Sequence, residues 1–232
     1  MNPPPLDILY EDNHVIAVAK PNGWPTTHFD GRHETMDRAV KHYLKEKHNK
    51  PGNVFLGIVQ RLDKPVSGVL LFARTSKAAA RLSKQFREGS IEKTYWAMVE
   101  GTIDTLAGSL EDWLLKDKEA GRVEVVEPHD AGARQALLHF QRKAAHGGLS
   151  WLELRPQTGR THQLRVQLAH RGQPIYGDAK YGSIHTFNRA IALHARSLTF
   201  LHPIRYEPVT LVAEIPRLWR GRFPYLLKEG QI

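Results

Sequence analysis

A short turn followed by an apolar run constrains the fold of this chain more than any other feature. Residues 60–68 read Gln-Arg-Leu-Asp-Lys-Pro-Val-Ser-Gly, and residues 69–73 are all apolar. An unbroken apolar run of this length predicts a strand that is buried on both faces. Pro65 disfavours the helical conformation at Lys64, so the segment before the strand is predicted to be an extended turn. This turn presents one carboxylate, that of Asp63.

Asp63 has two interpretations when this stretch is considered alone. An aspartate that stands just before a Lys-Pro pair is a common turn former. A carboxylate flanked by the two cations Arg61 and Lys64 is equally compatible with a residue that is kept for chemistry. The turn by itself does not separate these interpretations.

Length, cysteine content and charge limit the classes of protein that remain. With 232 residues, of which 41% are hydrophobic, the chain is long enough for one large domain or two small ones with a substantial core. It has no cysteine, which excludes disulfides and thiolate metal sites. No apolar stretch approaches the roughly 20 residues of a membrane span, and the first residues lack the features of a signal peptide. We therefore expect a cytoplasmic protein without a membrane association.

The net charge of +9 suggests a polyanionic partner. Residues 109–130 are rich in acids, so the positive excess lies in the rest of the chain.

Hydrophobic periodicity and turn residues predict the remaining elements. Strands are expected at residues 6–20 (a pair with its turn at 11–13), 91–100, 136–145, 149–155, 191–201 and 209–215, with a hairpin-like excursion at 101–135. Helices are expected at residues 35–47, 76–87 and 161–170, with Ser76 as an N-cap and with Gly89 and Gly172 as stops. Short strands and helices outside strict alternation favour an α+β fold with a mixed, largely antiparallel central sheet and flanking helices.

The helix predicted at residues 76–87 carries a row of cations along one side. Lys77, Arg81, Lys84 and Arg87 follow one another at spacings that align their charges. A solvated face is the ordinary explanation, and direct contact with phosphates is the alternative.

A second segment is specific enough to point to a family. Residues 154–172 read Leu-Arg-Pro-Gln-Thr-Gly-Arg-Thr-His-Gln-Leu-Arg-Val-Gln-Leu-Ala-His-Arg-Gly, and residues 174–182 read Pro-Ile-Tyr-Gly-Asp-Ala-Lys-Tyr-Gly. Together with the turn at residues 60–68, the chain resembles the RluA-type family of RNA pseudouridine synthases, whose signature is Arg-Leu-Asp-Lys/Arg-Pro-x-Ser-Gly. Further blocks at residues 8–14, 20–23, 93–101 and 193–203 fit in the family's order, so the resemblance covers roughly residues 6–215.

The resemblance implies an isomerase that converts a specific uridine to pseudouridine in a stem-loop of ribosomal or transfer RNA. This reaction breaks the N-glycosidic bond, turns the uracil and rejoins it to the ribose through C5, without any redox change. We therefore expect neither a metal nor an organic cofactor. The implied fold is a mixed sheet with an RNA-binding cleft. We expect one catalytic domain over residues 1–232, without a separate N-terminal RNA-binding domain, that acts as a monomer.

The resemblance also assigns three catalytic roles. Asp63 corresponds to the catalytic carboxylate, which acts either as a nucleophile at the ribose or as a base that removes a ribose proton. Arg165 corresponds to the ion-pair partner of this acid. Tyr95 corresponds to the active-site tyrosine, which stacks on the uracil or handles the proton at C5.

Other residues are expected to contact the RNA. By resemblance, Arg61 helps to displace the target nucleotide or holds its phosphate, and Lys64 is its neighbour on the same turn. Arg160 lies at the start of a predicted helix, which makes a natural phosphate seat. Leu164 and Leu193 are expected in the core, where lining the uracil pocket is the alternative.

Three residues depart from the family's pattern, and two other functions remain open. Gln60 and Gln167 stand where the family often has histidine, and Val66 replaces a common threonine. A catalytically idle RNA-binding protein with the same fold is the main alternative. A hydrolytic glycosidase ranks last, because most such enzymes use a pair of carboxylates. His162 and His170 lack the i, i+4 spacing of a zinc-binding helix, so no metal site is expected.

Overall fold

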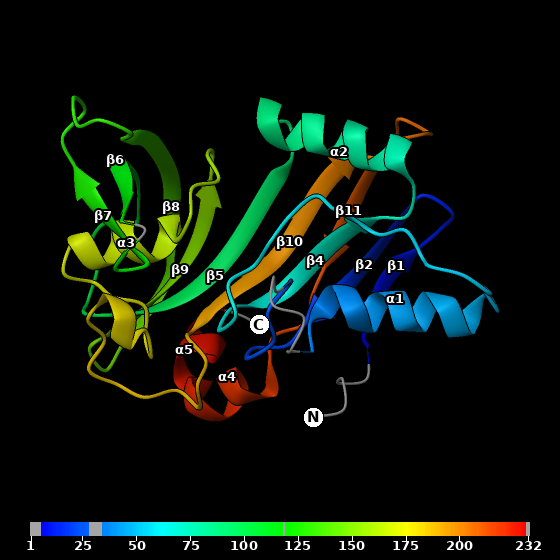
Figure 1. Ribbon diagram of the computed structural model, residues 1–232. Helices are drawn as coiled ribbons and strands as arrows, with labels where there is room; N and C mark the ends of the chain where they lie inside the picture. Colours follow the sequence, from blue (N-terminus) through cyan, green and yellow to red (C-terminus); the bar gives the residue numbers. More distant parts are fainter. Residues whose placement is uncertain (1–5, 28–33, 118, 231–232) are drawn as a thin grey trace. The chain divides into compact units, whose positions relative to one another are not determined.

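The structure is a computed structural model that describes residues 6–27, 34–117 and 119–230 (Figure 1). It divides into two compact units. Unit 1 comprises Met1–Lys93 and Ala195–Glu214, and unit 2 comprises Thr94–His194 and Ile215–Ile232. The expectation of one catalytic domain over the whole chain stays a prediction.

Unit 1 is built around the strand that the apolar run predicted. Its strands follow the order β1-β2-β4-β10, with β3 on β4 and β11 on β10. Their bounds are β1 Ile8–Glu11, β2 Val15–Lys20, β3 Gly57–Ile58, β4 Ser67–Ala73, β10 Leu193–Leu201 and β11 Pro208–Val212. All seven residues of β4 are buried, which confirms the prediction. The pairings β1–β2, β2–β4, β3–β4 and β10–β11 are antiparallel.

Two helices complete unit 1, α1 (Met36–Lys47) and α2 (Ser76–Glu88), close to their predicted bounds. Ala78 and Leu82 of α2 pack with β4 in one hydrophobic cluster. The predicted N-cap of α2 is wrong by one residue. The Thr75 hydroxyl, and not Ser76, accepts the Ala78 N–H at 3.2 Å, because Thr75 is the residue with extended backbone geometry. Gly89 ends the helix with φ 71°, as predicted.

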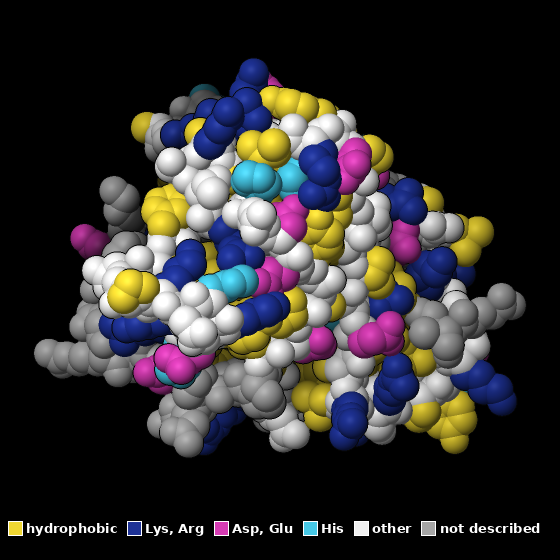
Figure 2. All heavy atoms as spheres, turned by 90° about the vertical axis from the view of Figure 1, so that its right-hand side faces the viewer, with side chains coloured by type: hydrophobic (Ala, Val, Ile, Leu, Met, Phe, Trp, Pro, Cys, Tyr) yellow, Lys and Arg dark blue, Asp and Glu magenta, His cyan; other side chains and the backbone are white. Residues whose placement is uncertain are grey.

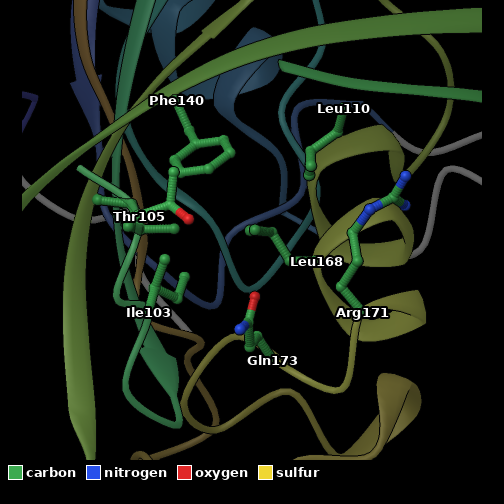
Figure 3. A pocket seen from close by; sticks show the side chains of 8 residues that line it. Ile103, Thr105, Leu110, Phe140, Leu168, Arg171 and Gln173 are labelled. Atoms are coloured by element: carbon green, nitrogen blue, oxygen red, sulfur yellow. The ribbon is translucent and has the colours of Figure 1, made fainter. Parts of the chain in front are cut away.

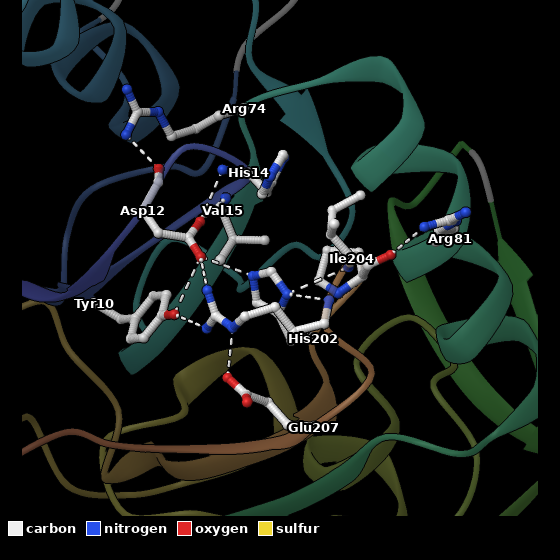
Figure 4. Close-up of polar contacts among 11 residues, drawn as sticks. Tyr10, Asp12, His14, Val15, Arg74, Arg81, His202, Ile204 and Glu207 are labelled. Carbon is white, nitrogen blue, oxygen red and sulfur yellow. Dashed lines mark hydrogen bonds and ion pairs between the residues drawn. The ribbon is translucent and has the colours of Figure 1, made fainter.

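A polar network fixes the turn between β1 and β2 (Figure 4). The Asp12 carboxylate accepts the N–H groups of His14 and Val15, both at 2.8 Å. His202 is fully buried and its Nδ1 accepts Arg205 N–H at 3.0 Å, so its Nε2 carries the proton and donates to Asp12 at 2.7 Å. Although burial alone raises the pKa of Asp12, these hydrogen bonds hold it at about 2. The network ties this turn to the loop between β10 and β11.

Unit 2 contains five antiparallel strands that are consecutive in the sheet order. The strands follow the order β5-β9-β8-β6-β7, and all four pairings are antiparallel. Their bounds are β5 Glu92–Glu100, β6 Ala107–Asp117, β7 Arg122–Val126, β8 Arg134–His146 and β9 Leu149–Pro156. The predicted pair of strands around residues 146–148 and the predicted hairpin-like excursion are both confirmed.

Short helices complete unit 2: α3 Gln163–His170, the 3₁₀ helix η1 Ala179–Tyr181, α4 Arg217–Arg222 and α5 Pro224–Glu229. α3 begins two residues later than predicted, and α4 and α5 were not predicted. Trp219 and Phe223 are buried where α4 meets α5. At the end of α5, a Cβ on Gly230 would overlap the indole ring of Trp151 on β9, so the backbone lies directly against this ring.

These two units confirm the predicted α+β class with a largely antiparallel sheet. Across the part of the chain that the structure describes, no helix combines the length and apolar character needed to cross a membrane.

Candidate active site

The turn that carries Asp63 is held in unit 1 by the segment that follows β2. Gly23 N–H donates to the Lys64 carbonyl at 2.8 Å. The Thr26 hydroxyl donates to the Leu62 carbonyl at 2.9 Å and accepts the Leu62 N–H at 3.1 Å. Leu62 is buried, whereas Asp63 is half-buried. The backbone is therefore fixed on both sides of a carboxylate that retains access to solvent.

Lys20 lies beside this turn with its ammonium group buried. The Lys20 side chain is 1% exposed, and its Nζ donates to the carbonyls of Pro21 at 3.0 Å and Lys64 at 3.2 Å. Burial lowers the pKa of Lys20 to about 7, and the nearby Asp63 carboxylate acts in the opposite direction. The predicted RNA-binding residues Arg61 and Lys64 have exposed side chains on either side of Asp63.

Two residues determine how the turn joins β4. The Gln60 side chain accepts the Leu71 N–H at 3.4 Å, so this departure from the family's pattern has a local role on the central strand. Gly68 adopts φ +117°, and a Cβ at this position would overlap the backbone of Ala195 on β10. Only glycine fits this combination of backbone angle and close approach.

Arg165 is fixed by a residue to which the sequence assigned no role. It lies on α3 in unit 2, 6% exposed, and binds the Asp178 carboxylate through Nε at 2.7 Å and Nη2 at 2.8 Å. Asp178 is 1% exposed. The face of the Arg165 guanidinium lies 5.0 Å from the centroid of the Tyr181 ring. Edge and face of this guanidinium are thus both constrained.

The start of α3 is organised by a buried glutamine. The Gln163 side-chain oxygen accepts the Thr158 hydroxyl at 2.8 Å and the Arg160 N–H at 3.0 Å. The exposed Arg160 side chain donates from Nε to the Gln135 carbonyl at 2.9 Å. A phosphate at this helix start would therefore meet the Arg160 guanidinium, because the backbone N–H of this residue is already bonded. The phosphate seat stays a prediction.

The other predicted site residues of unit 2 are Tyr95 on β5, Leu164 on α3 and Leu193, the first residue of β10. Tyr95 is half-buried on β5, opposite Leu154 of β9. Leu164 is 8% exposed and Leu193 is 3% exposed, so both belong to the interior, as expected. A role in a uracil pocket stays a prediction.

The cations in the row on α2 differ in their exposure to solvent. Lys77 and Lys84 are exposed. Arg81 is half-buried, donates to the Pro203 carbonyl at 2.6 Å, and lies 5.2 Å from the Tyr206 ring centroid. On the face shown in Figure 2, lysine and arginine side chains are interspersed with acids and do not merge into one basic patch. RNA contact by this row stays a prediction, and the local bonds of Arg81 make it the least suited member.

A cavity of about 290 Å³ lies in unit 2 among β6, β8, β9 and α3 (Figure 3). It is lined by Ile103, Thr105, Leu110, Phe140, Leu152, Leu168, Arg171 and Gln173. None of the predicted site residues lines it, so it is distinct from the predicted uracil pocket. Within the described ranges, no cluster of three or more His, Asp or Glu side chains is arranged to hold a metal ion.

Sequence reasoning missed Lys20, Asp178 and Tyr181 as neighbours of the predicted catalytic residues. All three lie in blocks that resemble the family. The available signal was their position in those blocks, because no spacing rule connects Asp178 to Arg165, 13 residues earlier.

Comparisons with known proteins agree with these observations. The profile of the family described as RNA pseudouridylate synthase matches residues 14–170, more than half of the chain. Ribosomal large subunit pseudouridine synthase D of Zymomonas mobilis is 34% identical over 234 residues, which cover 96% of this chain and 73% of that protein. tRNA pseudouridine synthase C of Haemophilus ducreyi is 34% identical over 240 residues, which cover 94% of each chain.

Among solved structures, human RNA pseudouridylate synthase domain containing 4 has the same fold, with a TM-score of 0.78 at 24% identity over 97% of this chain and 93% of that one. The chain spans 61% of the length of tRNA pseudouridine synthase C of Pectobacterium carotovorum and 94% of the length of the Haemophilus ducreyi protein. The profile match and the identities confirm the resemblance seen in the motifs. This chain belongs to the RNA pseudouridylate synthase family, as an RluA-type member of these isomerases.

Proposed function

We propose that this protein isomerises a specific uridine to pseudouridine in a stem-loop of ribosomal or transfer RNA, with Asp63 as the catalytic carboxylate. The observation that carries the proposal is the geometry of the Asp63 turn. The backbone on both sides of Asp63 is held by Gly23 and Thr26, while the carboxylate stays partly open to solvent beside the buried Lys20. The names of the relatives from Zymomonas mobilis and Haemophilus ducreyi support ribosomal and transfer RNA as the substrate classes.

The chemistry needs a carboxylate that stays ionised near the ribose. Asp63 either attacks the ribose carbon, and the bond that it forms breaks again when C5 bonds to this carbon, or it removes a ribose proton that it later returns. The bond from N1 to the ribose then breaks, the bond from C5 to the ribose forms, C5 loses its proton and N1 gains one. A cation within about 4–6 Å lowers the pKa of a carboxyl group by about 1–3 units. The Lys20 ammonium group lies beside the Asp63 turn in unit 1, and Arg165 is proposed to supply the positive charge that keeps Asp63 ionised in the complex with RNA.

Tyr95 and the cations on the Asp63 turn have roles in holding the RNA. We propose that Tyr95 stacks on the uracil, an interaction worth about 1–3 kcal/mol, or handles the proton at C5. Tyr95→Phe separates these roles, since lost activity with retained binding requires the hydroxyl. Arg61 and Lys64 are proposed to hold phosphates beside the extruded nucleotide.

Transcripts that carry tritium at C5 of uridine distinguish the three functions considered. Isomerisation releases tritium into water, because C5 gives up its hydrogen when it bonds to the ribose. A glycosidase releases free uracil that keeps its tritium, and an idle RNA-binding protein releases neither. We expect tritium release with the native protein and none with Asp63→Asn, which should still fold and bind RNA. Release of tritium by the Asn variant would end the assignment of Asp63.

The target is identified by mapping pseudouridine in total RNA from cells with and without the gene. We expect one modified position to disappear, within a stem-loop of ribosomal or transfer RNA. We also expect the enzyme to act as a monomer, and the mass of the protein–RNA complex from light scattering tests this.

A further inference from the structure

We propose that Asp178 and Tyr181 are positioning residues that hold the Arg165 guanidinium in one orientation for the reaction. This inference rests on the proposed function, in which Arg165 keeps the Asp63 carboxylate ionised. Neither residue is expected to touch the uridine. All the contacts that carry the inference lie within unit 2.

Asp178 fixes one edge of the guanidinium. Its two carboxylate oxygens bind Nε at 2.7 Å and Nη2 at 2.8 Å of Arg165, and both side chains are buried. A paired fork of this kind sets the plane of the guanidinium as well as its position. A buried ion pair contributes little net stability compared with apolar residues of the same size. The main consequence of the Arg165–Asp178 pair is the orientation of the guanidinium. Asp178 occupies Nε and Nη2, so a further carboxylate that approaches Arg165 meets the edge that carries Nη1.

Tyr181 fixes the face of the same guanidinium. The Arg165 guanidinium lies 5.0 Å from the centroid of its ring, and the Arg122 guanidinium of β7 lies 5.3 Å from it. The Tyr181 hydroxyl accepts the Val123 N–H at 3.1 Å and lies 2.8 Å from Nδ1 of His162. These bonds at the hydroxyl prevent the ring from turning away from Arg165.

Asp178 also sets how much positive charge Arg165 presents. The charged and titratable groups in contact with Arg165 or with Tyr181 in unit 2 include Asp178 at the edge of Arg165, Tyr181 at its face, and Arg122 and His162 against Tyr181. Removal of the Asp178 charge leaves the single positive charge of Arg165 without this counter-ion. A carboxylate that Arg165 keeps ionised then has a lower pKa. The same change frees the guanidinium to rotate, which slows the reaction.

Single-turnover kinetics with saturating enzyme test the inference, using Asp178→Asn and the matched control Asp112→Asn. Asp112 is 8% exposed and binds Arg171, the residue that follows α3, at 2.9 Å. We expect Asp178→Asn to slow the reaction by about 100-fold, as misplacement of a catalytic group does. RNA affinity should stay unchanged, and the acidic limb of the pH–rate profile should move to lower pH. Asp112→Asn should leave the rate of the folded enzyme and this limb unchanged.

Two further variants separate the possible failures. Tyr181→Leu removes the ring and keeps the ion pair, and it should slow the reaction without weakening RNA binding. In double-mutant cycles, either change should have no added effect on Arg165→Met. A folded Asp178→Asn with the native rate and acidic limb overturns the inference. If Asp178→Asn does not fold, a native rate for Tyr181→Leu overturns it instead. A native rate for Arg165→Met overturns the proposed role of Arg165 itself.

Discussion

Lys20 carries a charged group into the interior of unit 1, where water cannot solvate it. Its two acceptors are backbone carbonyls, which orient the ammonium group without neutralising it. The pKa of Lys20 is therefore lowered by burial to about 7, while the Asp63 carboxylate resists this change. Near neutral pH, the Asp63 carboxylate therefore affects the fraction of Lys20 that is protonated.

Asp63→Asn is expected to lower the pKa of Lys20 further. The substitution removes the negative charge that favours the ammonium form, and burial then acts unopposed. Lysine side-chain resonances followed by NMR across the neutral pH range measure this directly. Lys93 is the internal control, because its pKa is lowered by burial alone and should not move. An unchanged or raised pKa of Lys20 in the variant would contradict the proximity of the two groups.

Gly68→Ala is expected to destabilise unit 1 strongly. The backbone at Gly68 has φ +117°, and the added Cβ would overlap the backbone of Ala195. We expect the free energy of unfolding to fall by at least about 2–3 kcal/mol, measured by denaturant titration. Gly52→Ala is the matched control, because a Cβ at Gly52 meets nothing within 4 Å. It should change stability by less than about 0.5 kcal/mol. Equal effects of the two substitutions would refute this explanation.

Among the individual residues, the sequence predicted Asp63 as the catalytic carboxylate but did not predict that Lys20 lies beside it. The motif marks the residue because a turn before a buried strand is visible as a pattern. No sequence pattern marks Lys20 in this way, because a lysine before a proline is usually solvated. The burial of Lys20 depends on β4 and on the turn that packs over it. The pairing of Arg165 with Asp178 likewise depends on where the chain returns after α3.

Among the elements, the β1–β2 turn carries the clearest dependence on pH. Asp12 has a pKa of about 2 in the folded protein because His14, Val15 and His202 donate to it. Unfolded aspartate has a pKa near 3.9, so the unfolded chain takes up this proton first. The stabilisation is complete above about pH 5 and is lost as the pH falls toward 2.

Asp12→Asn is expected to lower the unfolding free energy at pH 7 by on the order of 2 kcal/mol and to flatten its decline between pH 5 and 2. Denaturant unfolding at several pH values measures both changes. Glu88→Gln is the control, because the pair of Glu88 with Lys84 at 3.7 Å is exposed and should contribute little. An equal acid slope in native protein and Asp12→Asn would rule out this role of the turn.

The strands and the long helices were predictable because their hydrophobic residues recur with the period of a strand or a helix. β4, α1, α2 and the β8–β9 pair all lie within a few residues of their expected bounds. α4 and α5 were missed because each has six residues, and Gly221 and Pro224 interrupt any pattern. Their formation depends on tertiary packing, in which Trp219 and Phe223 are buried.

For the whole molecule, charge governs the expected affinity for RNA. A net charge of +9 predicts binding that weakens steeply with salt, because phosphate contacts release counterions. We expect Arg61→Ala to reduce the slope of log affinity against log salt by about 0.7–0.9 for one lost phosphate contact. Filter binding or fluorescence anisotropy at several salt concentrations measures this. Lys45→Ala on the exposed side of α1 should leave the slope unchanged. The same slope for both variants would argue against a phosphate contact by Arg61.

The close approach of Gly230 to Trp151 has a practical consequence for handling this protein. Any larger residue at position 230 would push the end of α5 away from the indole ring. Substitutions in this segment therefore need to keep Gly230 in place. Trp151 is fully buried, so detachment of α5 should admit water to the ring and shift its emission to longer wavelength. Tryptophan fluorescence thus offers a label-free signal for the docking of α5.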